Sequence, residues 1–380
     1  MIYFDNAATT WPKPECVCDA VVNTMKKYGA NPGRSGHSMA LSAARIVYEA
    51  RELLAAFFNA ESSRNIVFTS NATEALNMAI KGVLKPGDHV ITSSMEHNSV
   101  ARPLFALQRM GVEWDVVKCD LRGMLDPDDV KKAIKPNTRL IAMTHASNLT
   151  GTILPVEEVG KIARERGILF LVDAAQTAGI IPIDVQRMNI DLLAFPGHKG
   201  LYGPQGTGGL YVRETLDITP IKEGGTGSLS EHLEQPQILP DRLESGTLNT
   251  PGIAGLAAGI RFITQKGIEN IRAHEQKLAG KFLEGLKHRK DISLYGPGDP
   301  TRMCAVVSLN VGELDSSELA YLLDSRCDIQ VRPGLHCTPL AHKTIGTWER
   351  GAVRFSFSVF NTEDEVDEAL RALDVICQGY

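Results

Sequence analysis

The chain has 380 residues, of which 43% are hydrophobic and 22% charged, and its formal net charge is −5. This composition excludes a disordered or repetitive protein, and the small, unclustered charge favours neither nucleic acid nor a membrane surface as partner. No apolar run reaches the ~18 residues of a membrane span, and the first residues, MIYFDNAATTWPKPE, lack the pattern of a signal peptide. We therefore expect a cytoplasmic protein whose partners are small molecules or proteins.

From about residue 64 to 212, short apolar runs alternate with amphipathic stretches, which is typical of βαβ units in a mostly parallel, doubly wound sheet. The best-marked helix begins at Ala72, where Asn71 and Glu74 have the spacing of an N-cap and its capping-box partner. The predicted strands are NIVFT (65–69), HVITS (89–93), EWDVVK (113–118), RLIAMT (139–144), ILFLVD (168–173), DLLAF (191–195) and GGLYV (208–212).

The pattern changes after Ser245. Long helices at about 252–266 and 268–289 precede shorter elements: ISLYG, MCAVVSLNV, a helix near 315–326, IQVR, AVRFSFS and a closing helix. Proline and glycine interrupt both helix and strand at Thr250-Pro251-Gly252. We therefore expect an α/β fold with a large domain at 16–250 and a smaller α+β domain at 251–380 that includes the N-terminal segment 1–15.

Seven cysteines are scattered along the chain. An odd number in a long sequence fits reduced thiols better than a disulfide framework. Cys16 and Cys18 lie close together, but no second Cys/His pair has zinc-ligand spacing, so we expect no metal site and place both cysteines in the first helix.

Polar side chains follow five of the predicted strands. Each alone has an ordinary explanation as a helix cap, a loop residue or a turn former. Because the carboxyl ends of parallel strands meet at one edge of a sheet, we expect these side chains together to form a ligand site. They are Thr73 with Glu74, His97, Asn148, Asp173, and His198 with Lys199.

Three features of this edge suggest the chemistry. The helix that begins at Ala72 offers free N–H groups beside the Thr73 hydroxyl, which suits a phosphate. Lys199 lies between a strand end and a glycine-rich loop, as a Schiff-base lysine does. No Walker or G-x-G-x-x-G motif supports a nucleotide. A phosphate, a buried aspartate and a reactive lysine together suggest pyridoxal 5′-phosphate (PLP).

The ordered motifs YFDNAATT, SNATEALN, MEHNSV, SNLTG, VDAAQTAG, GHKGLYGPQG, LESGTLNT, RPGLHC and VRFSFSVFNT resemble the class V aminotransferase family across the whole chain. The resemblance is to its cysteine desulfurase and selenocysteine lyase branch, and it implies a homodimeric PLP enzyme of fold type I that acts in sulfur metabolism, including iron–sulfur cluster assembly. Two positions depart from the family pattern. Pro196 stands where relatives commonly carry a phosphate-binding serine, and Leu335 stands where they often have a second histidine.

The resemblance also implies roles for single residues. Lys199 resembles the lysine that binds PLP covalently and moves the Cα proton, Asp173 the partner of the pyridine nitrogen, and Gln176 the partner of the phenolic oxygen. His97 resembles the imidazole stacked on the ring, and Thr247 a residue that reaches the phosphate of the partner subunit's cofactor. Ala72, Thr73 and His198 resemble phosphate-binding residues, and Asn148, Arg354, Arg34 and His37 resemble substrate-binding or active-site-loop residues.

Cys337 decides between reaction types. It lies in a segment punctuated by Pro333 and Pro339, and a neighbouring His336 or Arg332 would increase its thiolate fraction. The resemblance implies a group II desulfurase that converts L-cysteine to alanine, forms a persulfide on Cys337 and passes the sulfur to an acceptor protein. Selenocysteine lyase activity is the close alternative. Elimination, epimerisation or transamination without Cys337, and a non-catalytic sulfur-relay scaffold, also remain open.

Overall fold

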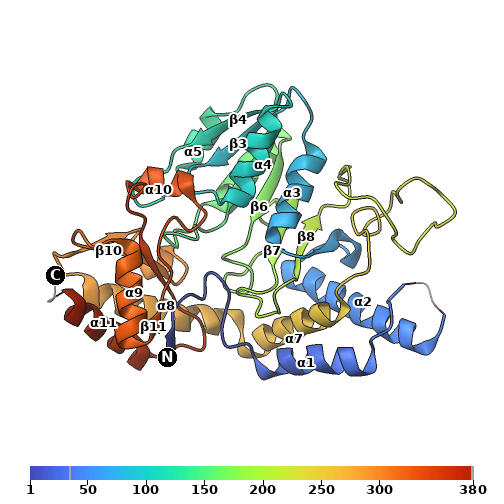
Figure 1. Cartoon of the computed structure of the whole chain (residues 1–380). Coiled ribbons are helices and arrows are strands. Elements are labelled where there is room, and N and C mark those ends of the chain that lie inside the picture. Colours follow the sequence, from blue (N-terminus) through green and yellow to red (C-terminus); the bar gives the residue numbers. More distant parts are fainter. Residues whose placement is uncertain (34–35, 378–380) are drawn as a thin grey trace.

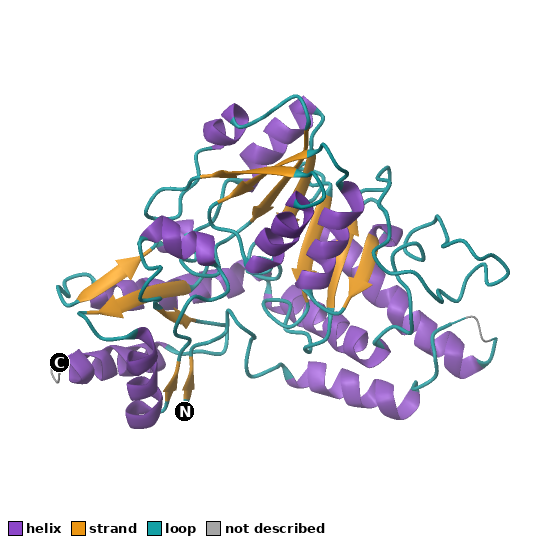
Figure 2. Ribbon diagram, turned by 45° about the horizontal axis from the view of Figure 1, so that its top comes forward, coloured by secondary structure: helices purple, strands orange, loops and turns teal. Residues whose placement is uncertain are grey.

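A seven-stranded sheet forms the centre of the protein in the computed structural model, which describes residues 1–33 and 36–377 (Figures 1 and 2). The strand order is β2-β8-β7-β6-β5-β3-β4, and β8 alone runs opposite to the other six strands. This confirms the predicted mostly parallel sheet. The strands are β2 (Ile66–Thr69), β3 (His89–Ser93), β4 (Glu113–Val117), β5 (Thr138–Thr144), β6 (Leu169–Asp173), β7 (Leu192–Pro196) and β8 (Gly208–Val212).

Both faces of this sheet are covered, as a doubly wound fold requires. In β7, Leu193 and Phe195 belong to one buried cluster, whereas Leu192 and Ala194 belong to the cluster on the opposite face. Consecutive apolar residues therefore reach two cores, which explains why the strands read as continuous hydrophobic runs. The helices are α1 (Glu15–Lys27), α2 (Ser38–Phe58), α3 (Ala72–Val83), α4 (Asn98–Gln108), α5 (Pro127–Lys132), α6 (Val156–Arg166) and α7 (Thr250–Lys266).

Helix α7 packs against α1 and α2 on the large-sheet side of the molecule, as Figure 1 shows. The change to the smaller layer of helices and strands falls at Gly267, the residue between α7 and α8. The division into two domains remains a proposal, and the packing of α7 favours a boundary at Gly267. Within the described ranges, no helix is long and apolar enough to cross a bilayer.

The smaller part contains a three-stranded antiparallel sheet, β12-β10-β9, covered by helices. The N-terminal β1 (Ile2–Tyr3) joins this part by pairing in parallel with β11. Segments from the two ends of the chain thus lie side by side. The elements are α8 (Ile268–Leu286), β9 (Ile292–Tyr295), β10 (Val306–Val311), α9 (Ser316–Cys327), β11 (Ile329–Gln330), α10 (Pro339–Ile345), β12 (Val353–Ser356) and α11 (Glu363–Cys377), with short 3₁₀ turns at Ser63–Asn65 and Pro300–Arg302.

Candidate active site

A cavity of about 100 Å³ lies at the carboxyl edge of the large sheet. It is formed where β2, β3, β5, β6 and β7 end, so the polar residues predicted from five separate strands meet there. Of the predicted site residues, Ala72, Thr73, His97, Asn148, Asp173, Gln176, His198 and Lys199 line it.

His97 and Thr73 are connected by Ser99, which the sequence analysis did not identify. The Ser99 hydroxyl lies 2.7 Å from Thr73 Oγ1 and 2.9 Å from His97 Nδ1, and the Ser99 N–H donates to the same ring nitrogen at 3.1 Å. His97 is thereby the N-cap of α4. Burial, followed by the charge of Lys199, lowers the pKa of His97 to about 4, so its ring is neutral at pH 7.

Asp173, at the end of β6, is one of two adjacent buried carboxyl groups. Burial raises the pKa of Asp173, whereas the Ala175 N–H at 2.9 Å and the charge of Lys199 oppose that rise. Its neighbour Glu96 accepts from the Thr144 N–H at 3.0 Å, and burial raises the pKa of Glu96 to about 8. This pKa favours the protonated form of Glu96 at neutral pH. Of the two carboxyl groups, Asp173 lines the cavity and Glu96 does not.

Lys199 lies in the lysine loop, which we define as residues 197–207 between β7 and β8. Burial, followed by the charge of Arg354, lowers the pKa of Lys199 to about 8. A substantial fraction of its amine is therefore neutral and nucleophilic near physiological pH.

The N-terminal segment fastens the lysine loop. The carbonyl of His198 accepts from Thr9 Oγ1 at 3.1 Å and from Lys13 Nζ at 2.6 Å, while the carbonyl of Lys199 accepts from Thr10 Oγ1 at 3.1 Å. Gln176, on the other wall, donates to the Ala7 carbonyl at 3.1 Å. These contacts hold the backbone around Lys199, and its amine forms no hydrogen bond with the residues that the structure describes.

Cys337 is exposed and does not line this cavity, but the backbone of its turn contacts residues at the cavity edge. Its carbonyl accepts from the Asn98 N–H at 2.8 Å, directly after His97, and the carbonyl of His336 accepts from Asn148 Nδ2 at 2.8 Å. The turn is strained, because His336 and Cys337 have φ values of 49° and 58°. Backbone contacts to two strand ends therefore keep the thiol segment against the sheet edge.

Of the two predicted sources of positive charge near this thiol, His336 is neutral. Its ring is buried, stacks on His342 and lies 2.9 Å from the carbonyl of Arg332. Burial lowers the pKa of His336 to about 3. Arg332 is the remaining cation of the predicted pair.

Arg354 lies close to the cavity but does not line it. Its guanidinium is only 2% exposed and donates to the Asn148 carbonyl at 2.9 Å and to the Asp5 carboxylate at 2.7 Å. Arg354 is thus already paired with Asp5, a residue that the sequence analysis did not identify.

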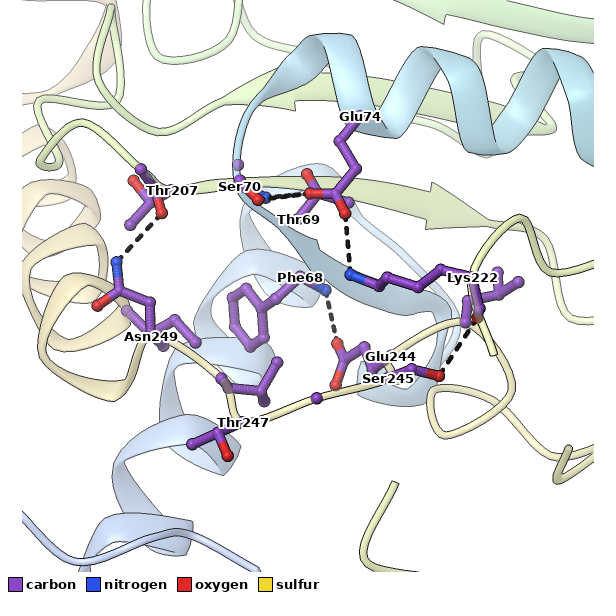
Figure 3. Close-up of a pocket in the computed structure, with 16 residues that line it drawn as sticks. Phe68, Thr69, Ser70, Glu74, Thr207, Lys222, Glu244, Ser245, Thr247 and Asn249 are labelled. Carbon is purple, nitrogen blue, oxygen red and sulfur yellow. Dashed lines mark hydrogen bonds and ion pairs between the residues drawn. The ribbon is translucent and has the colours of Figure 1, made fainter. Parts of the chain in front are cut away.

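Thr247 and His37 lie elsewhere. Thr247 is exposed and lines a separate pocket of about 150 Å³, in which Glu74 contacts Ser70 and Lys222 (Figure 3). Asn31 donates to Thr247 Oγ1 at 3.5 Å, so the loop before α2 approaches Thr247. His37 is exposed and caps α2, and Arg34 falls outside the described residues.

The donor set of the cavity fits PLP. The first turn of α3 and Thr73 offer donors for a phosphate, and the buried His198 Nδ1 has no partner within the described structure. Asp173 suits a protonated pyridine nitrogen, and Lys199 offers a reactive amine. Pro196 lines the cavity, so that position offers no hydroxyl.

The fold and this site define a PLP-dependent enzyme of fold type I. Residues 2–369 match the family model described as "Aminotransferase class-V". The chain therefore belongs to the class V aminotransferase family, whose members depend on PLP.

Relatives and solved structures agree over the full chain. A probable cysteine desulfurase of Methanothermobacter thermautotrophicus is 39% identical over 96% of this chain and 92% of its own length, and a cysteine desulfurase of Escherichia coli O157:H7 is 34% identical over 99% and 93%. The apo structure of a cysteine desulfurase from Thermococcus onnurineus NA1 is 38% identical, has a TM-score of 0.94 and covers 100% of this chain and 95% of its own.

Proposed function

We propose that this protein is a cysteine desulfurase that converts L-cysteine to L-alanine and leaves a persulfide on Cys337. The observation that carries this function is the exposed Cys337, whose backbone is fixed beside His97 at the edge of the Lys199 cavity. Full-length similarity to cysteine desulfurases supports the same reaction.

PLP, when bound, supplies an electron sink at the substrate Cα. Lys199 anchors PLP and moves the Cα proton, because its amine is partly neutral at physiological pH. Neutral His97 lines the cavity and can accept a proton from the bound substrate. The Cys337 thiolate attacks the substrate sulfur, the S–S bond forms as the Cβ–S bond breaks, and Cβ takes a proton to become the methyl group of alanine. L-Cysteine and the enzyme thiol thus give alanine and an enzyme persulfide.

The exposure of Cys337 favours transfer of the sulfur to an acceptor protein, which reaches the persulfide from solvent. All seven cysteines are free, which supports a reducing cytoplasmic location.

Thr247 and His37 support a homodimer. Both residues are exposed and lie away from the Lys199 cavity of their own chain. We infer that Thr247 completes the phosphate site of a second copy, as the family resemblance implies.

The mass of the Cys337 peptide tests the proposed reaction. After incubation with L-cysteine, this peptide should gain the mass of one sulfur atom, and Cys337→Ser should abolish both the gain and alanine formation. PLP binding should survive the substitution, because Cys337 does not line the cavity. Unchanged alanine formation by the variant would replace the persulfide mechanism with elimination or transamination. Continued release of selenium from L-selenocysteine by the variant would show that Cys337 is needed for sulfur alone.

A further inference from the structure

Arg354 is buried without full satisfaction of its guanidinium. One nitrogen donates to Asp5 Oδ1 at 2.7 Å and another to the Asn148 carbonyl at 2.9 Å, whereas the buried Nε has no acceptor within the described structure. An unpaired buried N–H is unfavourable, and the guanidinium retains capacity for another acceptor. Arg354 does not line the Lys199 cavity in this arrangement.

The backbone at Asp5 is fixed, but its carboxylate is not enclosed. Phe4 accepts from the Ser356 N–H at 2.7 Å, and the Asp5 carbonyl accepts from the Tyr3 hydroxyl at 3.2 Å. The Asp5 side chain is 23% exposed, and only Oδ1 contacts Arg354. Rotation of the Asp5 side chain alone is therefore sufficient to separate the pair.

The surrounding charges make this pair important for an amino-acid ligand. The positive charges of Arg354 and Arg332 lower the pKa of Lys199, and the negative charges of Asp173 and Asp5 raise it. Asp5 is the one acid that forms an ion pair with Arg354 among the described residues. A ligand carboxylate that approaches Arg354 meets Asp5 as a charge of the same sign, so the two compete for one guanidinium.

We propose that Asp5 is a specificity-determining residue, which competes with the α-carboxylate of the substrate for the guanidinium of Arg354. This inference rests on the proposed function, in which the substrate is an amino acid. A ligand with an α-carboxylate displaces Asp5 and gains the guanidinium. A simple amine cannot displace it, so the exchange selects amino acids over amines of similar size.

Equilibrium binding of L-alanine, the product of the proposed reaction, tests the competition without turnover. In calorimetric titrations of the PLP-loaded protein, Asp5→Ala should bind L-alanine at least threefold more tightly than wild type, because the competing carboxylate is gone. Asp5→Asn should also tighten binding, since it removes the charge but keeps an acceptor for the guanidinium. Ethylamine, which has no carboxylate, should show no such gain.

Asp328→Asn is the matched control. Asp328 pairs with the Met1 amine at 2.6 Å beside the same N-terminal strand but does not contact Arg354, so its loss should leave L-alanine affinity unchanged. Asp5→Asn preserves shape and hydrogen bonding and therefore carries the test even if Asp5→Ala does not fold. Unchanged or weaker L-alanine binding by Asp5→Asn would overturn the competition. A wild-type protein that does not bind L-alanine would instead refute the proposed function.

Discussion

Lys199 differs from an ordinary surface lysine in its charge state. Burial disfavours the ammonium form, and the positive charges of Arg354 and Arg332 disfavour it further, although Asp173 and Asp5 act in the opposite direction. The net result is a pKa of about 8. The pH dependence of the reactivity of the Lys199 amine can therefore be measured without turnover.

We predict that the apoprotein captures PLP covalently at a rate that rises as the pH approaches about 8 and then levels off. Below that pKa the neutral amine, which is the nucleophile, falls about tenfold per pH unit. Stopped-flow absorbance at a series of pH values measures the rate. Lys199→Ala should show no capture at this site, and a rate that still climbs near pH 10 would indicate an unperturbed lysine.

Strand-end residues were predictable from sequence because each follows an apolar run at a short, regular distance. The sheet then brings them to a common edge. Asp5 was not predictable in this way, since its partner Arg354 is 349 residues away and no local pattern connects the two. Ser99 offered a weak local signal, because its position two residues after His97 fits a helix cap.

At the scale of elements, the predicted strands of the large sheet agree with the observed ones to within about one residue at each end. Strong apolar runs bounded by polar residues explain this success. Helix α10 was not predicted, since it spans only 7 residues and begins at a proline immediately after the Cys337 turn. Its formation depends on packing rather than on a periodic pattern.

Close packing between α7 and the lysine loop yields a second prediction. A Cβ at Gly259 would lie 2.2 Å from the Leu201 carbonyl oxygen, so Gly259→Ala should displace the lysine loop and cost about 1–3 kcal/mol. Thermal unfolding and PLP affinity should both decrease. Gly225→Ala is the control, because a Cβ there meets nothing within 4 Å and should change neither measurement.

The loop that carries Thr247 is fixed by a buried ion pair. Glu244 accepts from Arg51 at 2.7 and 2.9 Å and from the Phe68 N–H at 2.6 Å. We predict that Glu244→Gln lowers the thermal unfolding midpoint, because breaking a buried pair costs about 3–5 kcal/mol. Glu313→Gln, which breaks a pair that is 97% exposed at the glutamate, should change the midpoint little. Equal effects of both variants would contradict a structural role for the Glu244 pair.

At the scale of the whole molecule, the exposed Thr247 and the half-buried Lys199 predict complementation between subunits. Separately, Lys199→Ala and Thr247→Ala should each reduce activity. Mixed under conditions that exchange subunits, they should regain activity, because one site of the heterodimer combines an intact Lys199 with Thr247 from the other copy. Desulfurase assays before and after mixing measure this gain. No gain after confirmed exchange would place Thr247 in its own chain's site.

The pairing of β1 with β11 has a consequence for synthesis of the chain. Arg354, the partner of Asp5, is synthesised 349 residues after it. At a synthesis rate of roughly 5–20 residues per second, this interval is about 20–70 s. The strands that end around Lys199 emerge well before β11 and β12. Lys199 is made 155 residues before Arg354, so at the same rate the nascent large sheet exposes its lysine for roughly 8–31 s. PLP can enter during this interval, before the two ends of the chain close over the site.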